Sequence, residues 1–174
     1  MNLFFRRIWV LIVAALSSQR GELNRPYLLH YRVWLTDQDM FMHMTNSRYL
    51  SFSDLARLNL LIRTGLAKAL RKNGWRLEIC AQTRTLTRML KTPQAFEMVC
   101  EIEGWSDIHI AFNHSFKRRG SLHAAVNTLM RVADADGNIV PPQSLIDAVT
   151  WAEASPELPD YFIGLAKEVG DAHS

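Results

Sequence analysis

Four polar residues between a predicted strand and a predicted long helix have the types and spacing to do chemistry. Two carboxylates, Asp37 and Asp39, lie in a short irregular stretch, and His43 and Asn46 follow within seven residues of Asp39. A carboxylate can attack an electrophilic carbon or activate water if it is partly desolvated and held in line. The first amides of a helix lack intrahelical partners and lie at the positive end of the helix dipole. They could therefore stabilise an oxyanion formed near the carboxylates.

The segment that runs from Tyr31 to Arg57 resembles the hot-dog thioesterases of the 4-hydroxybenzoyl-CoA thioesterase type. Their pattern is a strand, Asp-x-Asp, Gly-His or a variant, Asn-x-x-Tyr, and an acidic residue five positions beyond the tyrosine. The matching residues here are Asp37, Asp39, His43, Asn46, Tyr49 and Asp54. The stretch DxxxHMTNSRYL is closest to a branch with hydrophobic N-terminal leaders, and the resemblance covers residues 26 to about 152. Met42 stands where many members have glycine, and Asp54 replaces the more usual glutamate.

This resemblance implies an α+β protein with the hot-dog fold, in which a curved antiparallel sheet wraps a long central helix. It also implies an acyl-CoA thioesterase that uses Asp39 as nucleophile or general base, with the helix N-terminal amides as oxyanion hole. His43 and Asn46 are the other catalytic candidates, and Tyr49 and Asp54 are candidate substrate-binding residues. Because CoA thiolate is a modest leaving group, the reaction requires no metal and no other cofactor.

Each of these residues also has a structural interpretation. Asp37 and Asp39 could accept hydrogen bonds from loop amides, and we favour that role for Asp37 only. The other structural alternatives are a hydrogen-bonding role for His43, a helix cap at Asn46, a core or dimer contact for Tyr49, and an ion pair of Asp54 with Arg57.

Basic residues form two clusters later in the chain, one of Arg84, Arg88 and Lys91 and one over residues 117–119. Because the CoA nucleotide carries phosphates, such clusters could bind it. We therefore count Arg84 and Arg88 as candidate substrate-binding residues, with a solvated strand end as the alternative.

Hydrophobic periodicity indicates the elements that must position these residues. A long helix is predicted over Ser47–Lys72, with Asn46 as its cap, Gly65 as its one interruption and Asn73-Gly74 as its end. The predicted strands are Tyr27–Thr36, Trp75–Leu90, Ala95–Trp105, Ile108–Phe116 and Leu122–Val132, and short helices are predicted over Gln143–Ala154 and Tyr161–Glu168. Four strands in succession favour an antiparallel sheet, which can bury the apolar helix by curving around it.

The composition indicates one folded domain, since the chain has 174 residues of which 48% are hydrophobic. The net charge of +3 resides in residues 1–25, which leaves the rest of the chain neutral and argues against nucleic acid as a ligand. Cys80 and Cys100 are predicted to be reduced thiols on strands. The predicted boundaries are an N-terminal hydrophobic and basic helix over 1–25, the hot-dog domain over 26–152, and a tail with a short helix over 153–174.

The N-terminal segment, residues 1–19, places two arginines before an apolar run from Ile8 to Leu16. The uncharged run from Ile8 to Gln19 is too short for an ordinary transmembrane helix. A secretory signal, an interfacial membrane helix and a helix packed on its own domain remain open. We expect a cytoplasmic protein that could contact a membrane through residues 1–20.

We expect a homodimer or tetramer, because a single hot-dog domain exposes strand edges. In the family the substrate lies between subunits, and the strands over 108–117 and 121–132 are predicted to continue the sheet across a twofold axis. Two alternatives to a thioesterase are a hot-dog hydratase or dehydratase and a non-catalytic, membrane-associated acyl-binding protein. The Asn-x-x-Tyr context fits a thioesterase better than a hydratase.

Overall fold

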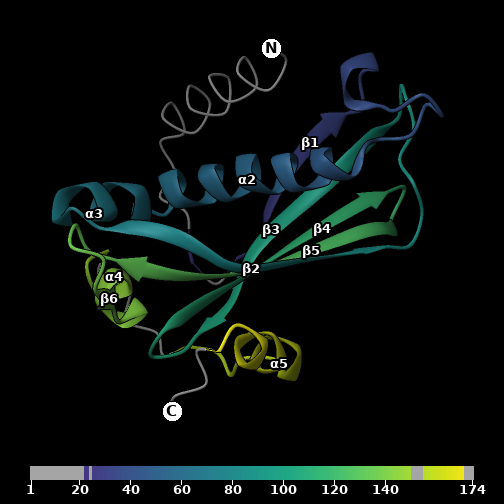
Figure 1. Cartoon of the computed structure of the whole chain (residues 1–174). Helices are drawn as coiled ribbons and strands as arrows, with labels where there is room; N and C mark the ends of the chain where they lie inside the picture. Colours follow the sequence, from purple (N-terminus) through teal and green to yellow (C-terminus); the bar gives the residue numbers. More distant parts are fainter. Residues whose placement is uncertain (1–21, 24, 150–154, 171–174) are drawn as a thin grey trace.

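A six-stranded antiparallel sheet curves around one long helix, α2, in the computed structural model of this chain (Figure 1). The structure describes residues 22–23, 25–149 and 155–170. The strands are β1 (Tyr27–Arg32), β2 (Arg76–Leu86), β3 (Ala95–Trp105), β4 (His109–Arg118), β5 (Ser121–Ala133) and β6 (Ile139–Val140). The helices are η1 (Leu35–Asp37), α2 (Asn46–Arg63), α3 (Leu66–Asn73), α4 (Pro142–Asp147) and α5 (Asp160–Glu168). The predicted α+β architecture is thereby confirmed.

The strand order is β1-β3-β4-β5-β2, and β6 pairs with the end of β5. Both β4 and β5 are interior strands, since each is hydrogen-bonded to a neighbour on either side. The prediction that the strands over 108–117 and 121–132 continue the sheet across a twofold axis is therefore wrong. Among the described strands, β1 and β2 form the two ends of the sheet path.

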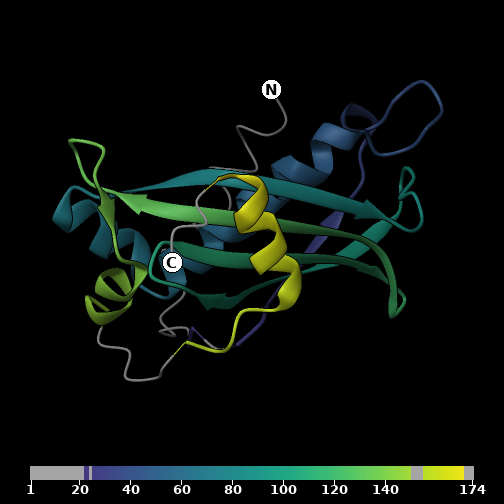
Figure 2. The ribbon, with the colours of Figure 1, turned by 60° about the horizontal axis from the view of Figure 1, so that its bottom comes forward.

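Alternating residues of the strands build a different core on each face of the sheet. An aromatic cluster of Tyr31, Phe96 and Phe116 packs with Tyr49 and Phe52 of α2, with ring centroids 4.9 to 5.9 Å apart. On the opposite face α5 lies across the sheet, as Figure 2 shows. A smaller cluster joins it there through Ala111, Leu129, Phe162 and Leu165. The sheet is thus covered by α2 on one side and by α5 on the other.

The predicted single helix over Ser47–Lys72 is two helices, α2 and α3, separated at Thr64 and Gly65. Gly65 has φ of +84°, a left-handed conformation that a residue without Cβ adopts easily and that ends the hydrogen-bond ladder of α2. The predicted stop at Gly74 is confirmed, with φ of +69°.

Other differences from the prediction lie at element ends. β1 ends at Arg32 rather than Thr36 because the chain turns into η1, and β2 ends at Leu86 rather than Leu90. The helix predicted over Gln143–Ala154 is the shorter α4, with residues 150–154 outside the described part. Cys80 and Cys100 are reduced thiols on β2 and β3, as predicted.

No helix within the described residues is long and apolar enough to cross a membrane. The prediction of a hydrophobic and basic helix over residues 1–25 falls almost wholly on residues outside the described part.

Candidate active site

Asp39 lies in a tight turn between η1 and α2, and its carboxylate is held by the backbone of that turn. Its Oδ1 atom accepts hydrogen bonds from the amides of Phe41 at 2.9 Å and His43 at 3.1 Å. The Asp39 amide in turn donates to the His43 carbonyl at 2.9 Å. Both bonds to the carboxylate use Oδ1, so Oδ2 keeps its capacity to accept a proton or to act as a nucleophile. The side chain is exposed, so a ligand can reach it.

Met42 adopts a left-handed conformation at the tip of this turn, with φ of +63°. Its amide donates to the Asp39 carbonyl at 3.1 Å, which closes the turn. The left-handed region is costly for a residue with a Cβ atom and open to glycine. Glycine, which the pattern resembled by this sequence has at the position, would avoid that cost, whereas methionine is tolerated here at a cost in stability.

The turn leads directly into the N-terminus of α2. Thr45, not Asn46 as predicted, is the N-cap residue, and Asn46 is the first helical residue. The Thr45 side chain makes no capping hydrogen bond to the helix amides. The Arg48 amide donates to the Thr45 carbonyl at 3.0 Å, so the first-turn amides that could bind an anion are those of Asn46 and Ser47.

Asp37 is fully buried two residues before Asp39 and stabilises the backbone around it. Its Oδ2 atom accepts a hydrogen bond from the Trp34 amide at 2.9 Å, and Oδ1 lies 3.5 Å from Nε of Arg48. The Asp37 carbonyl accepts a hydrogen bond from the Thr45 amide at 2.9 Å. These contacts tie η1 to the start of α2, which is the structural role that the sequence favoured for Asp37.

A second loop, residues 87–94 between β2 and β3, lies against the Asp39 turn. The Met44 amide donates to the Leu90 carbonyl at 2.8 Å, and His43 forms an isolated antiparallel bridge with Lys91. The buried Tyr49 hydroxyl accepts a hydrogen bond from the Leu90 amide at 3.1 Å, and burial raises the pKa of this tyrosine. Tyr49 therefore fixes the second loop to α2 from within the core.

The predicted cluster of Arg84, Arg88 and Lys91 is divided in the structure. The guanidinium of Arg84 lies over the Tyr49 ring, 5.9 Å from its centroid, whereas Arg88 and Lys91 are exposed in the 87–94 loop. Arg84 thus lies against the first turn of α2, and Lys91 lies beside the Asp39 turn. Arg88 lies instead beside the start of β5, where its amide donates to the His123 carbonyl at 2.9 Å.

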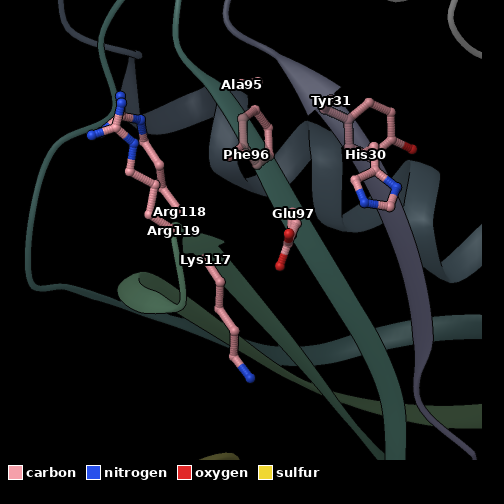
Figure 3. Close-up of a pocket in the computed structure, with 8 residues that line it drawn as sticks. All are labelled: His30, Tyr31, Ala95, Phe96, Glu97, Lys117, Arg118 and Arg119. Carbon is pink, nitrogen blue, oxygen red and sulfur yellow. The ribbon is translucent and has the colours of Figure 1, made fainter.

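The second predicted basic cluster, residues 117–119, borders a shallow pocket of about 300 Å³ at the same end of the sheet. Figure 3 shows the side chains of Arg118 and Arg119 on one side of this pocket and His30 on the other, with Glu97 between them. The carboxylate of Glu97 reduces the positive charge of the pocket, so this site is less suited to phosphate than the basic residues alone predict.

Asp54 forms an ion pair with Arg57 one turn further along α2, the structural alternative that the sequence raised. The Asp54 side chain is more than half exposed, and the Arg57 guanidinium reaches under the helix to lie 6.0 Å from the Phe112 ring centroid. Both residues border a groove of about 530 Å³ between α2 and β2. The groove is otherwise lined mainly by apolar residues, Leu55, Leu58 and Leu61 of α2, Leu77 and Ile79 of β2, and Met130 of β5.

Beneath α2 the sheet carries a polar residue whose environment the sequence could not specify. His114 alternates with Phe112 and Phe116 on the face that the pattern marks as buried, and it is fully buried. Burial and the nearby Arg57 lower the pKa of His114 to about 3, so it is neutral at physiological pH. Its Nδ1 atom lies 3.0 Å from the Val126 carbonyl oxygen, a hydrogen bond that requires the proton on Nδ1.

Residues 33–162 match the family described as the thioesterase-like superfamily, and this is most of the chain. The chain therefore belongs to that superfamily, and its sheet and central helix are the hot-dog fold. It is similar to Protein THEM6 of Danio rerio, with 32% identity over 104 residues, 60% of this chain and 52% of that protein. Protein THEM6 of Xenopus laevis is 29% identical over 104 residues, 60% of this chain and 50% of that protein. The chain thus spans about half the length of the curated relatives it matches.

Solved thioesterase structures share the fold at low sequence identity. A gentisyl-coenzyme A thioesterase is 19% identical with a TM-score of 0.62, covering 70% of this chain and 99% of that one. A 1,4-dihydroxy-2-naphthoyl-CoA thioesterase from Synechocystis is 14% identical with a TM-score of 0.63, covering 72% and 96%. A mutant 4-hydroxybenzoyl CoA thioesterase complexed with 4-hydroxybenzoyl CoA is 16% identical with a TM-score of 0.63, covering 72% and 99%.

Proposed function

We propose that this protein hydrolyses acyl-CoA, or an acyl group on another pantetheine thiol, to the free acid and the thiol. The observation that carries the proposal is the Asp39 carboxylate, held through Oδ1 in a turn that leads into the uncapped N-terminus of α2. This arrangement supports a nucleophile or base on one side of a thioester carbonyl and amide donors for its oxygen on the other.

In this reaction the oxygen of water adds to the acyl carbon and the carbon–sulfur bond breaks. Asp39 either takes the proton from water or attacks the carbon itself, forming an anhydride that water then opens. The departing thiolate takes up one proton, so the products are a carboxylic acid and a thiol. We assign His43 and Asn46 to the same site because they lie in the turn and at the first residue of α2.

For the substrate we propose contacts with residues around α2. Arg88 is exposed in the 87–94 loop, which lies against the Asp39 turn, and Arg84 lies against the first turn of α2, where each could meet a CoA phosphate. Tyr49 supports this region from the core, and Asp54 borders the groove along α2, whose apolar lining suits an acyl chain.

The proposed working unit is a homodimer or tetramer. We place the interface between subunits at the outer edge of β2 in place of β4 and β5. This strand ends the sheet path among the described strands and borders the groove along α2. Light scattering on the purified chain should give at least twice the 20.0 kDa of one chain. A monomer with normal turnover would refute a site shared between subunits.

The test of the proposed activity is Asp39→Asn, assayed by thiol release from short, long and aromatic acyl-CoAs. Asparagine keeps the Oδ1 acceptor of the turn, so the variant should fold normally and lose kcat by about a hundredfold or more. Asp136→Asn, which changes an exposed carboxylate in the turn after β5, is the matched control and should keep full activity. Unchanged turnover in Asp39→Asn would remove Asp39 from the mechanism, and hydration of an enoyl-CoA without thiol release would identify a hydratase instead.

A further inference from the structure

Large apolar side chains gather at the end of the molecule that holds Asp39. Twelve such side chains are exposed among the described residues, and seven of them lie here. Met40 is 86% exposed, and Leu35 and Phe41 are each 70% exposed. The others at this end are Trp34, Met42, Met89 and Leu122. Single exposed apolar residues are ordinary, but a concentration of this kind marks an interaction surface.

Hydrogen bonds join the segments that carry these residues into one continuous surface. The loop from β1 to α2 bonds to the 87–94 loop through the Met44 amide and the Leu90 carbonyl, 2.8 Å apart. The 87–94 loop in turn bonds to the start of β5 through the Thr87 amide and the His123 carbonyl, 2.9 Å apart. Figure 1 shows these loops and the β4–β5 hairpin together at one end of the sheet. We call residues 32–48, 86–96 and 117–123 the loop end.

The loop end is strongly basic. It contains seven lysine and arginine residues and two acidic residues, Asp37 and Asp39, and the half-buried Glu97 borders it opposite Lys117. Of these two, Asp37 is fully buried and lies beside Arg48, so Asp39 is the one exposed carboxylate of the loop end. The basic residues are Arg32, Arg48, Arg88, Lys91, Lys117, Arg118 and Arg119. The surface thus combines protruding apolar side chains with basic residues around them.

We propose that the loop end docks onto an anionic lipid surface. Exposed tryptophan, phenylalanine, leucine and methionine can enter the boundary between headgroups and acyl chains, while lysine and arginine meet the anionic headgroups. A second copy of the chain fits this surface less well, because a symmetric contact would bring two basic surfaces together. The docking involves the described body of the protein and does not depend on residues 1–20.

Docking would bring the candidate site to the lipid interface. Met40 and Phe41 directly follow Asp39, so their entry into the headgroup region would bring the carboxylate close to acyl chains that partition into the bilayer. The substrate class that follows, which rests on the proposed function, is acyl-CoA with a chain long enough to enter a membrane.

The direct test uses an environment-sensitive fluorophore on the full chain, attached at Met40→Cys in a Cys80→Ser background. The label should shift to shorter emission wavelengths with vesicles of phosphatidylcholine and phosphatidylserine, and much less with phosphatidylcholine alone. The matched control carries the label at Ile163→Cys, an exposed apolar position of α5 on the opposite face of the sheet, and should not shift. An unshifted label at position 40 on vesicle-bound protein would overturn the proposal. A shift that high protein concentration produces without vesicles would also overturn it, because it would indicate contact with a second copy of the chain.

A charge-reversal pair tests the electrostatic part. Arg88→Glu with Lys91→Glu should weaken binding to phosphatidylserine vesicles by about tenfold or more, since each basic residue near an anionic membrane strengthens binding substantially. Lys68→Glu with Lys72→Glu makes the same charge change on exposed positions of α3 and should change vesicle binding much less. Equal losses in the two pairs would show a response to net charge and would overturn the proposal. Thiol release from a water-soluble acyl-CoA without vesicles tests the proposed hydrolysis separately.

Discussion

Asp37 and Asp39 are two residues apart in the chain and occupy opposite environments. Asp37 is fully buried, beside Arg48 and the Trp34 amide, whereas Asp39 is exposed and held in its own turn. The same contrast separates two histidines, His43 in the exposed turn and His114 in the core. Residue type alone therefore does not distinguish a structural role from a chemical one. The burial and the contacts of each side chain distinguish the two.

The largest effect on stability is expected from Asp37→Asn, which removes the charge beside Arg48 in a buried site. The free energy of unfolding should fall by about 3 kcal/mol, the low end for breaking a buried pair, because Arg48 is partly exposed. Urea unfolding of this variant and of Asp39→Asn measures the comparison directly. If Asp39→Asn proves equally destabilised, both aspartates are structural and the contrast fails.

His114 should make the protein less stable in mild acid. The unfolded chain binds a proton near pH 6.5 that the folded protein does not bind until about pH 3, so stability falls as the pH decreases through this window. Each pH unit costs about 1.4 kcal/mol, or about 2 kcal/mol between pH 6.5 and 5. The groups that act on the imidazole from neighbouring elements are Arg57 of α2 and the Val126 carbonyl of β5.

The variant His114→Gln isolates this contribution, because glutamine does not titrate in that range. Its unfolding free energy should depend on pH less steeply than that of the wild type. Between pH 6.5 and 5 it should fall by about 2 kcal/mol less. Parallel pH profiles for the two proteins would mean that folding does not shift the pKa of His114.

Tyr49→Phe should lower the unfolding free energy by about 1.5 kcal/mol, since the buried Leu90 amide loses its acceptor. The 87–94 loop should also exchange amide hydrogens faster, because that bond fixes it to α2. Hydrogen exchange at Leu90 is the specific readout, and unchanged protection there would show that the loop is held by its contacts with the Asp39 turn instead.

The smallest expected change is a gain. Met42→Gly should raise the unfolding free energy by about 0.5 to 1 kcal/mol. The change removes the cost of a left-handed methionine, and the larger conformational entropy of glycine in the unfolded chain offsets part of that gain. Thermal unfolding measures the gain. A loss of stability would show that the Met42 side chain makes contacts worth more than the backbone cost.

The sequence could predict where the candidate residues lie along the chain because they are local. Asp39 and His43 share one turn, in which the His43 amide donates to Asp39 Oδ1, and Asn46 begins the helix that follows. The proximity of Lys91 to that turn could not be predicted, since it depends on the pairing of the two loops through the backbone bond between Met44 and Leu90.

The sequence by itself determined the strand alternation, the helical character of residues 47–72 apart from the break at Gly65, and the irregular stretch that carries Asp39, because these are short-range patterns of side-chain type. Only the tertiary structure decided that β4 and β5 are interior strands, that Asp37 is buried and Asp39 exposed, and that apolar and basic side chains share one end of the molecule. The physical reason is that burial and adjacency depend on which distant segments pair in the sheet, and local periodicity places a residue on a face without specifying what covers that face.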